Sequence, residues 1–255
     1  MLFTLNTYFI EVIILNSYDS LWKPLDTDLS LKHFTKPHIV SLVIIFSIIT
    51  LMYLFKDTLR KKKYEKRFSK TLAIILIIHQ ITLYYWYVNN NLLCLKEALP
   101  LYICRISIIL CIIMLLSKSY KIFDIIYFWG IGGATIALIF HDNSLYPFPH
   151  YMFVQFFISH GGILISALFM IFVHKYTPNL NSIKRTFKWT FIYFGITIPT
   201  NYLIDSNYCY LRKLPCFVHF KLFPNTPIFF VPLMITGLCM FFVLLYLPFY
   251  RKAKL

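Results

Sequence analysis

The sequence predicts an all-α protein, a polytopic membrane bundle of about seven transmembrane helices, with its N-terminus outside and its C-terminus cytoplasmic. Composition is the first reason: 59% of the 255 residues are hydrophobic and only 14% are charged, which leaves more apolar surface than a soluble globule can cover. The second reason is length, because the apolar residues gather into segments of roughly 17 to 25 residues, enough to cross a hydrocarbon core of about 30 Å. The third is the one-sided placement of lysine and arginine in the loops between these segments.

Seven apolar segments follow one another, separated by loops mostly of about 5 to 15 residues. The predicted spans are residues 39–55, 71–88, 99–116, 122–140, 151–173, 187–204 and 228–247. No linker or internal repeat divides them, so residues 38–250 are expected to form a single helical domain. Residues 1–37 form an extracytoplasmic segment that either lies along the interface as a helix or enters the bundle, without the basic leader and cleavage site of a removed signal peptide. Residues 251–255 form a basic cytoplasmic tail.

The basic loops set the predicted orientation. Residues 56–70 hold eight basic and two acidic residues, and the other basic loops on that side contain Lys118, Lys121, Lys175, Lys184 and Arg185. Because cytoplasmic loops are rich in lysine and arginine, this side is expected to face the cytoplasm. Arg212, Lys213 and Lys221 on the other side are the main exceptions. The net charge of +15 is therefore attributed to topology and to attraction toward anionic lipids, and no nucleic-acid partner is expected.

Polar side chains inside the spans are the candidates for function, since burying them in a bilayer is costly. Twelve such residues were considered: His79, Gln80, Cys104, Arg105, Ser107, Cys111, Gln155, Ser159, His160, Thr197, Thr200 and Asn201. At about 1.5 Å per residue, Cys104, His160 and Asn201 all fall in the outer half of the membrane, and His79 lies near its middle.

Cys104 and His160 are the pair most suited to chemistry. Pro100 suits the first turn of a helix and leaves Cys104 in or just past that turn, where the helix N-terminus favours a thiolate. The adjacent Arg105 is expected to snorkel toward the outer headgroups, and His160 at a similar depth provides a base. Each has a simpler explanation, because a membrane cysteine is often a small hydrophobic residue and a histidine often makes packing hydrogen bonds.

The remaining cysteines and the glycines have structural interpretations. Cys94, Cys111 and Cys239 are interpreted as small hydrophobic residues, whereas Cys209 and Cys216 are either an oxidised pair or free thiols. No Cys-x-x-Cys or His-x-x-x-His pattern occurs, so no metal is expected. Gly130, Gly132 and Gly133 predict a helix-packing face, and Gly161-Gly162 either allows close packing or gives a ligand access to the backbone. Asn201 and Asn207 either cap the sixth helix or orient the imidazole.

Several strings in the chain resemble a known family. They are Leu-Pro-Leu-Tyr-Ile-Cys at 99–104, Tyr-Phe-Trp-Gly-Ile-Gly-Gly-Ala at 127–134, the stretch from Phe-Pro-His at 148–150 to Gln-Phe-Phe-Ile-Ser-His-Gly at 155–161, and the Asn-Tyr pairs at 201–202 and 207–208. Over about residues 70–250 the chain resembles the bacterial YwaF-like integral membrane proteins, relatives of eukaryotic transmembrane protein 164. Two positions depart from that pattern: Tyr102 replaces a common histidine, and His141-Asp142-Asn143 replaces an acidic-proline turn.

The resemblance implies an acyltransferase. The eukaryotic relative is a phospholipid acyltransferase that needs no acyl-CoA, so Cys104 would accept the acyl group and His160 would act as base. Six further residues would bind or orient the substrate: Asn201, Asn207, Arg105, Gln155, His79 and Gln80. Membrane phospholipids are the expected partners, no cofactor or metal is expected, the cell membrane is the expected location, and the oligomeric state is open.

A transporter or permease subunit is the alternative. In that interpretation His79, Gln80, Arg105, His160 and Asn201 would line a polar path through the membrane. A one-sided pocket favours the enzyme, whereas polarity that continues through the inner half favours transport. The inner halves of the spans are apolar apart from His79 and Gln80, which favours the enzyme.

Overall fold

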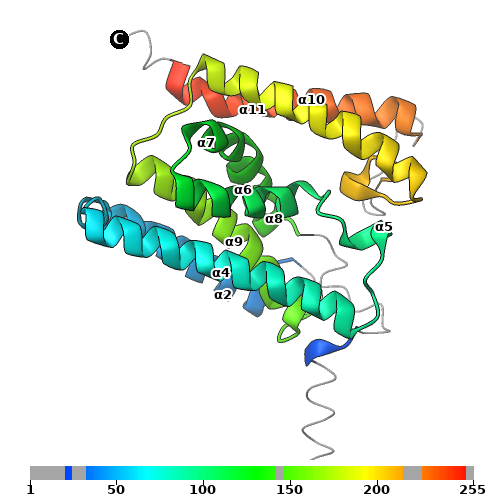
Figure 1. The fold of residues 1–255 in the computed structure, drawn as a ribbon, viewed down its shortest axis with the longest axis horizontal. Helices are drawn as coiled ribbons and strands as arrows, with labels where there is room; N and C mark the ends of the chain where they lie inside the picture. The colour runs from blue at the N-terminus through cyan, green and yellow to red at the C-terminus, as the bar shows by residue number, and fades with distance from the viewer. Residues whose placement is uncertain (1–20, 25–32, 142–145, 215–225, 251–255) are drawn as a thin grey trace, which may run out of the picture.

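The computed structural model describes residues 21–24, 33–141, 146–214 and 226–250, and in these residues it contains helices and no strand. The all-α prediction is therefore confirmed (Figure 1). The helices are α2 (Lys36–Leu54), α3 (Lys56–Leu59), α4 (Lys62–Asn89), α5 (Leu95–Ala98), α6 (Ile103–Ser117), α7 (Tyr120–Ile126), α8 (Gly133–Ile139), α9 (Tyr151–Phe172), α10 (Leu180–Leu203) and α11 (Pro227–Tyr250). A π-helical stretch, η1 (Tyr127–Gly132), joins α7 to α8, and a 3₁₀ turn, η2 (Tyr208–Tyr210), follows α10.

Five helical segments in the described part of the chain are long and apolar enough to cross a membrane: Lys36–Leu54, Lys62–Asn89, Tyr120–Ile139, Tyr151–Phe172 and Pro227–Tyr250. The other two predicted spans also fall on helices, but α6 has only 15 residues and the first turns of α10 carry Lys184, Arg185 and Lys188. The membrane helical bundle is thus established, and the number of seven spans stays a prediction. Most of the N-terminal segment 1–37 and the tail 251–255 lie outside the described residues.

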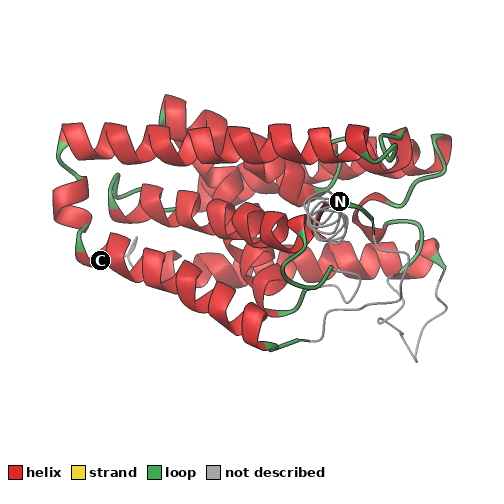
Figure 2. Ribbon diagram, turned by 90° about the horizontal axis from the view of Figure 1, so that it is seen from below, coloured by secondary structure: helices red, strands yellow, loops and turns green. Residues whose placement is uncertain are grey.

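The helices form three layers (Figure 1): α2 and α4 on one side, α10 and α11 on the other, and α6 to α9 between them. Figure 2 shows the long helices running side by side along one axis. The middle layer is the core. In Tyr120–Ile139 and in α9, 61% of the most apolar stretch of the helix is buried, against 17% in α2 and 11% in α11. The exposed apolar faces of α2 and α11 are what a lipid-facing helix presents.

The basic loops meet at one end of the bundle. Lys118 Nζ lies 2.7 Å from Glu65 Oε1, and His174 Nε2 lies 3.1 Å from the same oxygen. The Tyr176 hydroxyl donates to the Lys118 carbonyl oxygen at 2.8 Å. These contacts place the start of α4, the end of α6 and the end of α9 together, which we call the basic end; the other is the opposite end. The prediction that these loops share a side is confirmed, and which compartment each end faces stays a prediction.

The helix that crosses the core from Tyr120 to Ile139 packs through two of its glycines. A Cβ atom added to Gly130 would lie 2.8 Å from Ile163 Cγ2 on α9, and one added to Gly132 would lie 2.1 Å from the ring of Phe241 on α11. A Cβ atom on Gly133 would meet nothing within 4 Å. The predicted packing face therefore consists of Gly130 and Gly132, and Gly133 does not contribute to it.

We expect Gly130→Ala to destabilise the protein by roughly 1–3 kcal/mol, because Ile163 is buried and β-branched and cannot move aside without strain. Gly133→Ala is the matched control and should leave stability unchanged or slightly raised, since alanine is the better helix former. Thermal unfolding of the purified proteins in detergent measures both changes. Equal stability of the two variants would contradict the packing role of Gly130.

Candidate functional site

Cys104 lies in the opening turn of α6, as predicted, but the helix begins later than expected. Tyr102 precedes the first helical residue, Ile103, with an extended backbone, so Pro100 lies before the helix and the prediction that it occupies the first turn is wrong. The thiol of Cys104 lies against the backbone N–H groups of Cys104 and Arg105. Free N–H groups at a helix N-terminus stabilise negative charge.

Tyr193 and Cys209 lie beside Cys104. The Tyr193 hydroxyl donates to the Leu101 carbonyl oxygen at 2.6 Å and lies 2.8 Å from Cys209 Sγ, and the Ile103 N–H donates to the same sulfur at 3.4 Å. Burial raises the pKa of the Cys209 thiol to about 11, so it stays protonated at neutral pH. Cys209 is a free cysteine, and Cys216, its suggested oxidation partner, lies outside the described residues.

Arg105 does not snorkel to the headgroups, so that prediction is wrong. Its side chain is buried and turns back to the segment before α6, where it donates to the carbonyl oxygens of Glu97 and Leu99. It also donates to the Tyr87 hydroxyl, and its guanidinium lies about 5 Å from the rings of Tyr87 and Tyr102. Two backbone acceptors and two aromatic faces satisfy the charge where water is absent. Arg105 therefore fixes the chain that leads into α6.

Only one of the two ring nitrogens of His160, Nδ1, makes hydrogen-bond contacts with the residues that the structure describes. Its Nδ1 lies 2.9 Å from the Phe156 carbonyl oxygen and 3.0 Å from Ser159 Oγ. A carbonyl oxygen only accepts, so Nδ1 carries the proton and Nε2 is the basic nitrogen. Nε2 forms no hydrogen bond with any residue that the structure describes. This arrangement suits a general base.

His79, Gln80 and Gln155 form a second polar group beside His160. His79 Nε2 donates to the Gln155 carbonyl oxygen at 3.2 Å, and Gln80 Nε2 donates to His79 Nδ1 at 3.1 Å. His79 and His160 lie on the neighbouring helices α4 and α9. A cavity of about 190 Å³ between α4 and α9 opens at His79 and Gln155.

Cys104 and His160 lie at matching depths on neighbouring helices. Both α6 and α9 end at the basic end, so they run in the same direction, and the Cys111 thiol lies beside Ser166. Counting seven residues back from each, about 10 Å along a helix, places Cys104 level with Ser159, the neighbour of His160. The two side chains do not hydrogen-bond to each other in the described structure. Their pairing as thiol and base stays a prediction.

Asn201 and Asn207 hold the loop after α10. Asn201 is fully buried; its Oδ1 accepts from the Tyr208 N–H and the Ser206 hydroxyl, both at 2.8 Å, and its Nδ2 donates to the Tyr208 carbonyl oxygen at 3.0 Å. Asn207 Oδ1 accepts from the backbone N–H groups of residues 212 and 213 at 3.0 and 2.9 Å. Asn201 lies inside α10, whose C-cap is Ile204, and these side-chain contacts go to residues 206–213, so they support the loop and do not cap the helix.

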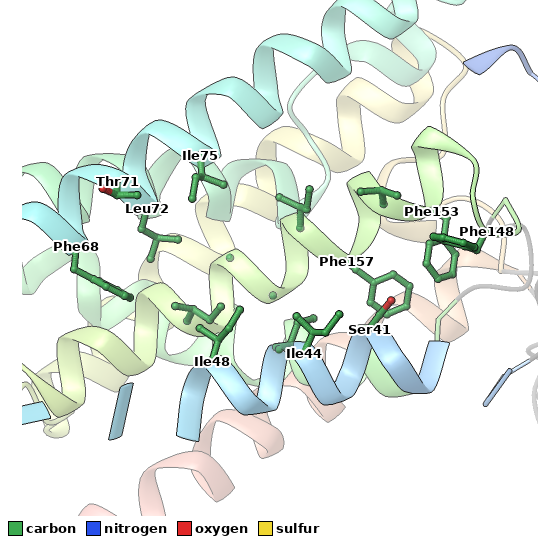
Figure 3. Close-up of a pocket in the computed structure, with 16 residues that line it drawn as sticks. Ser41, Ile44, Ile48, Phe68, Thr71, Leu72, Ile75, Phe148, Phe153 and Phe157 are labelled. Carbon is green, nitrogen blue, oxygen red and sulfur yellow. The ribbon is translucent and has the colours of Figure 1, made fainter. Parts of the chain in front are cut away.

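A cavity of about 450 Å³ lies between α2 and α4 with α9 as its floor. In Figure 3, Leu72 and Ile75 of α4 face Ile44 and Ile48 of α2, and Phe148 and Phe153 lie at one end. Gly161 and Gly162 lie on this floor, where added Cβ atoms would come within 2.9 Å of Ile45 and 2.6 Å of Leu76. The glycines therefore let α2 and α4 approach α9 closely, which is the packing interpretation of this pair.

A second apolar cavity of about 460 Å³ lies between α6, α7 and α10. Leu101 and Tyr193 line it near Cys104, and Lys121 and Arg185 line it at the basic end. Sequence reasoning did not single out Tyr193 or Cys209 as neighbours of Cys104. For Cys209, the sequence feature that could have indicated a place near the site is the Asn207-Tyr208 string of the family resemblance, which directly precedes it.

The fold and these side chains define a membrane helical bundle with a thiol and an imidazole buried at one depth. A family model, that of the TMEM164 family, matches residues 33–246, and the chain belongs to this family. The predicted relationship to transmembrane protein 164 is thus confirmed, while the YwaF-like assignment stays a prediction. Searches of curated proteins and of solved structures found no match.

We expect Asn201→Ala to lower the free energy of unfolding by roughly 2–3 kcal/mol, because it leaves the Tyr208 N–H and C=O without their buried partner. Thr200→Ala is the matched control: among the residues that the structure describes, its hydroxyl bonds only to the Ile196 carbonyl oxygen of its own helix, and its loss should be nearly neutral. Thermal unfolding in detergent compares the two. An Asn201→Ala protein as stable as the control would argue against the loop-supporting role.

Proposed function

We propose that this protein is an integral membrane transacylase of the cell membrane that moves a fatty acyl group between phospholipids through a thioester on Cys104. The observation that carries the proposal is the free Nε2 of His160, a neutral base at the depth of a thiol that begins a helix. Membership of the TMEM164 family supports it, because the resemblance to transmembrane protein 164 implies this activity. No soluble cofactor enters the reaction.

The reaction uses one proton that His160 holds and returns. Nε2 takes the proton of Cys104, the thiolate attacks the ester carbonyl of the donor phospholipid, and the ester C–O bond breaks as the C–S bond forms. The departing lysophospholipid alkoxide takes the proton from His160. The hydroxyl of an acceptor lipid then gives its proton to Nε2 and attacks the thioester, and the released thiolate regains that proton.

The cavity between α6, α7 and α10 is the proposed site for the acyl chain. It begins near Cys104 at Leu101 and Tyr193 and continues beside Ile106 and Leu110, which lies about 9 Å beyond Cys104 along α6. Its walls are almost wholly apolar, so a thioester-linked chain could lie there. His79, Gln80 and Gln155 would orient the lipid from the His160 side, whereas Arg105, Asn201 and Asn207 would act by holding the loops around Cys104.

The transporter remains the second candidate because the polar group of His79, Gln80 and Gln155 borders a cavity. From this group toward the basic end, however, the contact of α4 with α9 continues through buried Leu76 and Leu72, with Leu76 packed on Gly162. Because these polar residues are confined to one half of the bundle, they favour a pocket with a single opening over a path through the membrane. The enzyme is therefore the better account.

Cys104→Ser and His160→Gln should each lower acyl exchange between phospholipids at least ~100-fold, because the first removes the thiolate and the second removes the base. Exchange is measured by mass spectrometry after reconstitution with a donor phospholipid and an isotope-labelled lysophospholipid. Cys111→Ser is the matched control on the same helix and should retain nearly full activity. The double variant should be little worse than either single variant, since the two residues act as a unit.

Trapping tests the intermediate directly. A phospholipid with an alkynyl acyl chain should leave a hydroxylamine-sensitive label on Cys104, and this label should be absent from Cys104→Ser. Full exchange by Cys104→Ser, or a label that moves with Cys209 instead, would overturn the assignment and leave the transporter as the better account.

A further inference from the structure

A cavity at the basic end, far from Cys104, has a different character from the others. It measures about 300 Å³ and is lined by residues from the start of α4 and the end of α6. From Cys104 to Leu116 along α6 is about 18 Å. A ligand in this cavity therefore belongs to neither the thiol nor the proposed acyl-chain site.

Three lysines line one wall of the cavity. Lys62, Lys66 and Lys70 follow one another at intervals of four residues, which places them on one face of α4. All three are exposed, and none forms an ion pair with a residue that the structure describes. Like charges at this spacing destabilise a helix, so a bound anion would relieve a repulsion that is built into α4.

The opposite wall is fixed by a network around Lys118. This residue ends α6 with a left-handed backbone, φ 56°, which directs its ammonium to Glu65 Oε1 at 2.7 Å and to the Ser69 hydroxyl. His174 Nε2 contacts the same carboxylate oxygen at 3.1 Å. Glu65 also lines the cavity, from α4 between Lys62 and Lys66, but its carboxylate is already engaged by Lys118 and His174.

The surroundings of the cavity are those of a lipid headgroup site. The apolar part of α4 begins directly after Lys70, so the lysines lie where headgroups meet the hydrocarbon. Leu115 and Leu116 form an apolar wall, and Leu116 is 55% exposed toward the surroundings of the bundle. Basic pockets between membrane helices bind phosphate headgroups in this way. A freely soluble anion would make no use of the apolar wall.

We propose that this cavity binds the phosphate of an anionic phospholipid, with Lys62, Lys66 and Lys70 around the phosphate and the acyl chains descending past Leu116. The lipid is a resident ligand rather than the reacting one, because its ester groups lie at the end of α6 remote from Cys104. The site does not depend on the proposed acyl transfer.

The test compares two triple variants of equal charge. Lys62→Gln/Lys66→Gln/Lys70→Gln removes the cavity lysines, and Lys61→Gln/Lys63→Gln/Arg67→Gln removes three exposed cations from the same segment that do not line it. Dioctanoyl phosphatidylglycerol, dioctanoyl phosphatidylcholine and inorganic phosphate are titrated into the detergent-purified full chain, and the unfolding midpoint is followed. A ligand that binds only the folded protein raises this midpoint by an amount that grows with the logarithm of the ratio of its concentration to its Kd.

Phosphatidylglycerol should raise the midpoint of the natural chain and of the second triple variant by several degrees, and phosphatidylcholine should not. The cavity variant should lose most of this rise, and Lys66→Gln alone should weaken the apparent affinity several-fold, each rise being measured from the variant's own midpoint without ligand. An equal loss in both triple variants would show non-specific charge attraction and overturn the site. An equal effect of inorganic phosphate at the same concentration would overturn the lipid as its ligand.

Discussion

The close packing of α9 against its neighbours is the constraint on which the rest of the structure depends. Small residues on α9, or facing it, let four elements approach: Gly161 receives Ile45 of α2, Gly162 receives Leu76 of α4, Ser166 meets Cys111 of α6, and Ile163 fits over Gly130 of η1. Without a hydrophobic drive between helices in lipid, such van der Waals contacts supply the association. They also fix the rotation of α9, and with it the direction in which His160 points.

The sequence predicted the helices better than their ends. Apolar length identifies a membrane helix because the bilayer admits few other structures, and every predicted span falls on a helix. The predicted span begins at residue 71 because hydropathy falls before it, whereas good helix formers without glycine or proline extend the helix α4 back to Lys62. Arg105 was misplaced because its partners, the Glu97 carbonyl and Tyr87, come from folding of the chain and leave no mark on local spacing.

The sequence predicts the depth of the candidate site residues in the membrane, but it does not predict which of their side chains are in contact. Residue counts place Cys104 and His160 at one level, and the Cys111–Ser166 contact agrees with that level. Whether two side chains meet also depends on rotation about each helix axis, which packing of the whole bundle decides. For the same reason Tyr193 and Cys209, which come from α10 and the loop after it, could not be placed beside Cys104 by spacing.

The shortness of α6 bears on how a buried thiol would meet a lipid ester in the proposed reaction. Fifteen residues of helix span about 22 Å, less than the hydrocarbon thickness of about 30 Å, so one or both ends of α6 lie below the membrane surface. The segments around 97–102 and 206–213 cover the Cys104 end and satisfy its polar groups through Arg105 and Asn201. In the proposed reaction, a thiol at that end would be shielded from water yet close to the level of the phospholipid ester groups. A longer helix would carry the same first-turn cysteine out to the solvent.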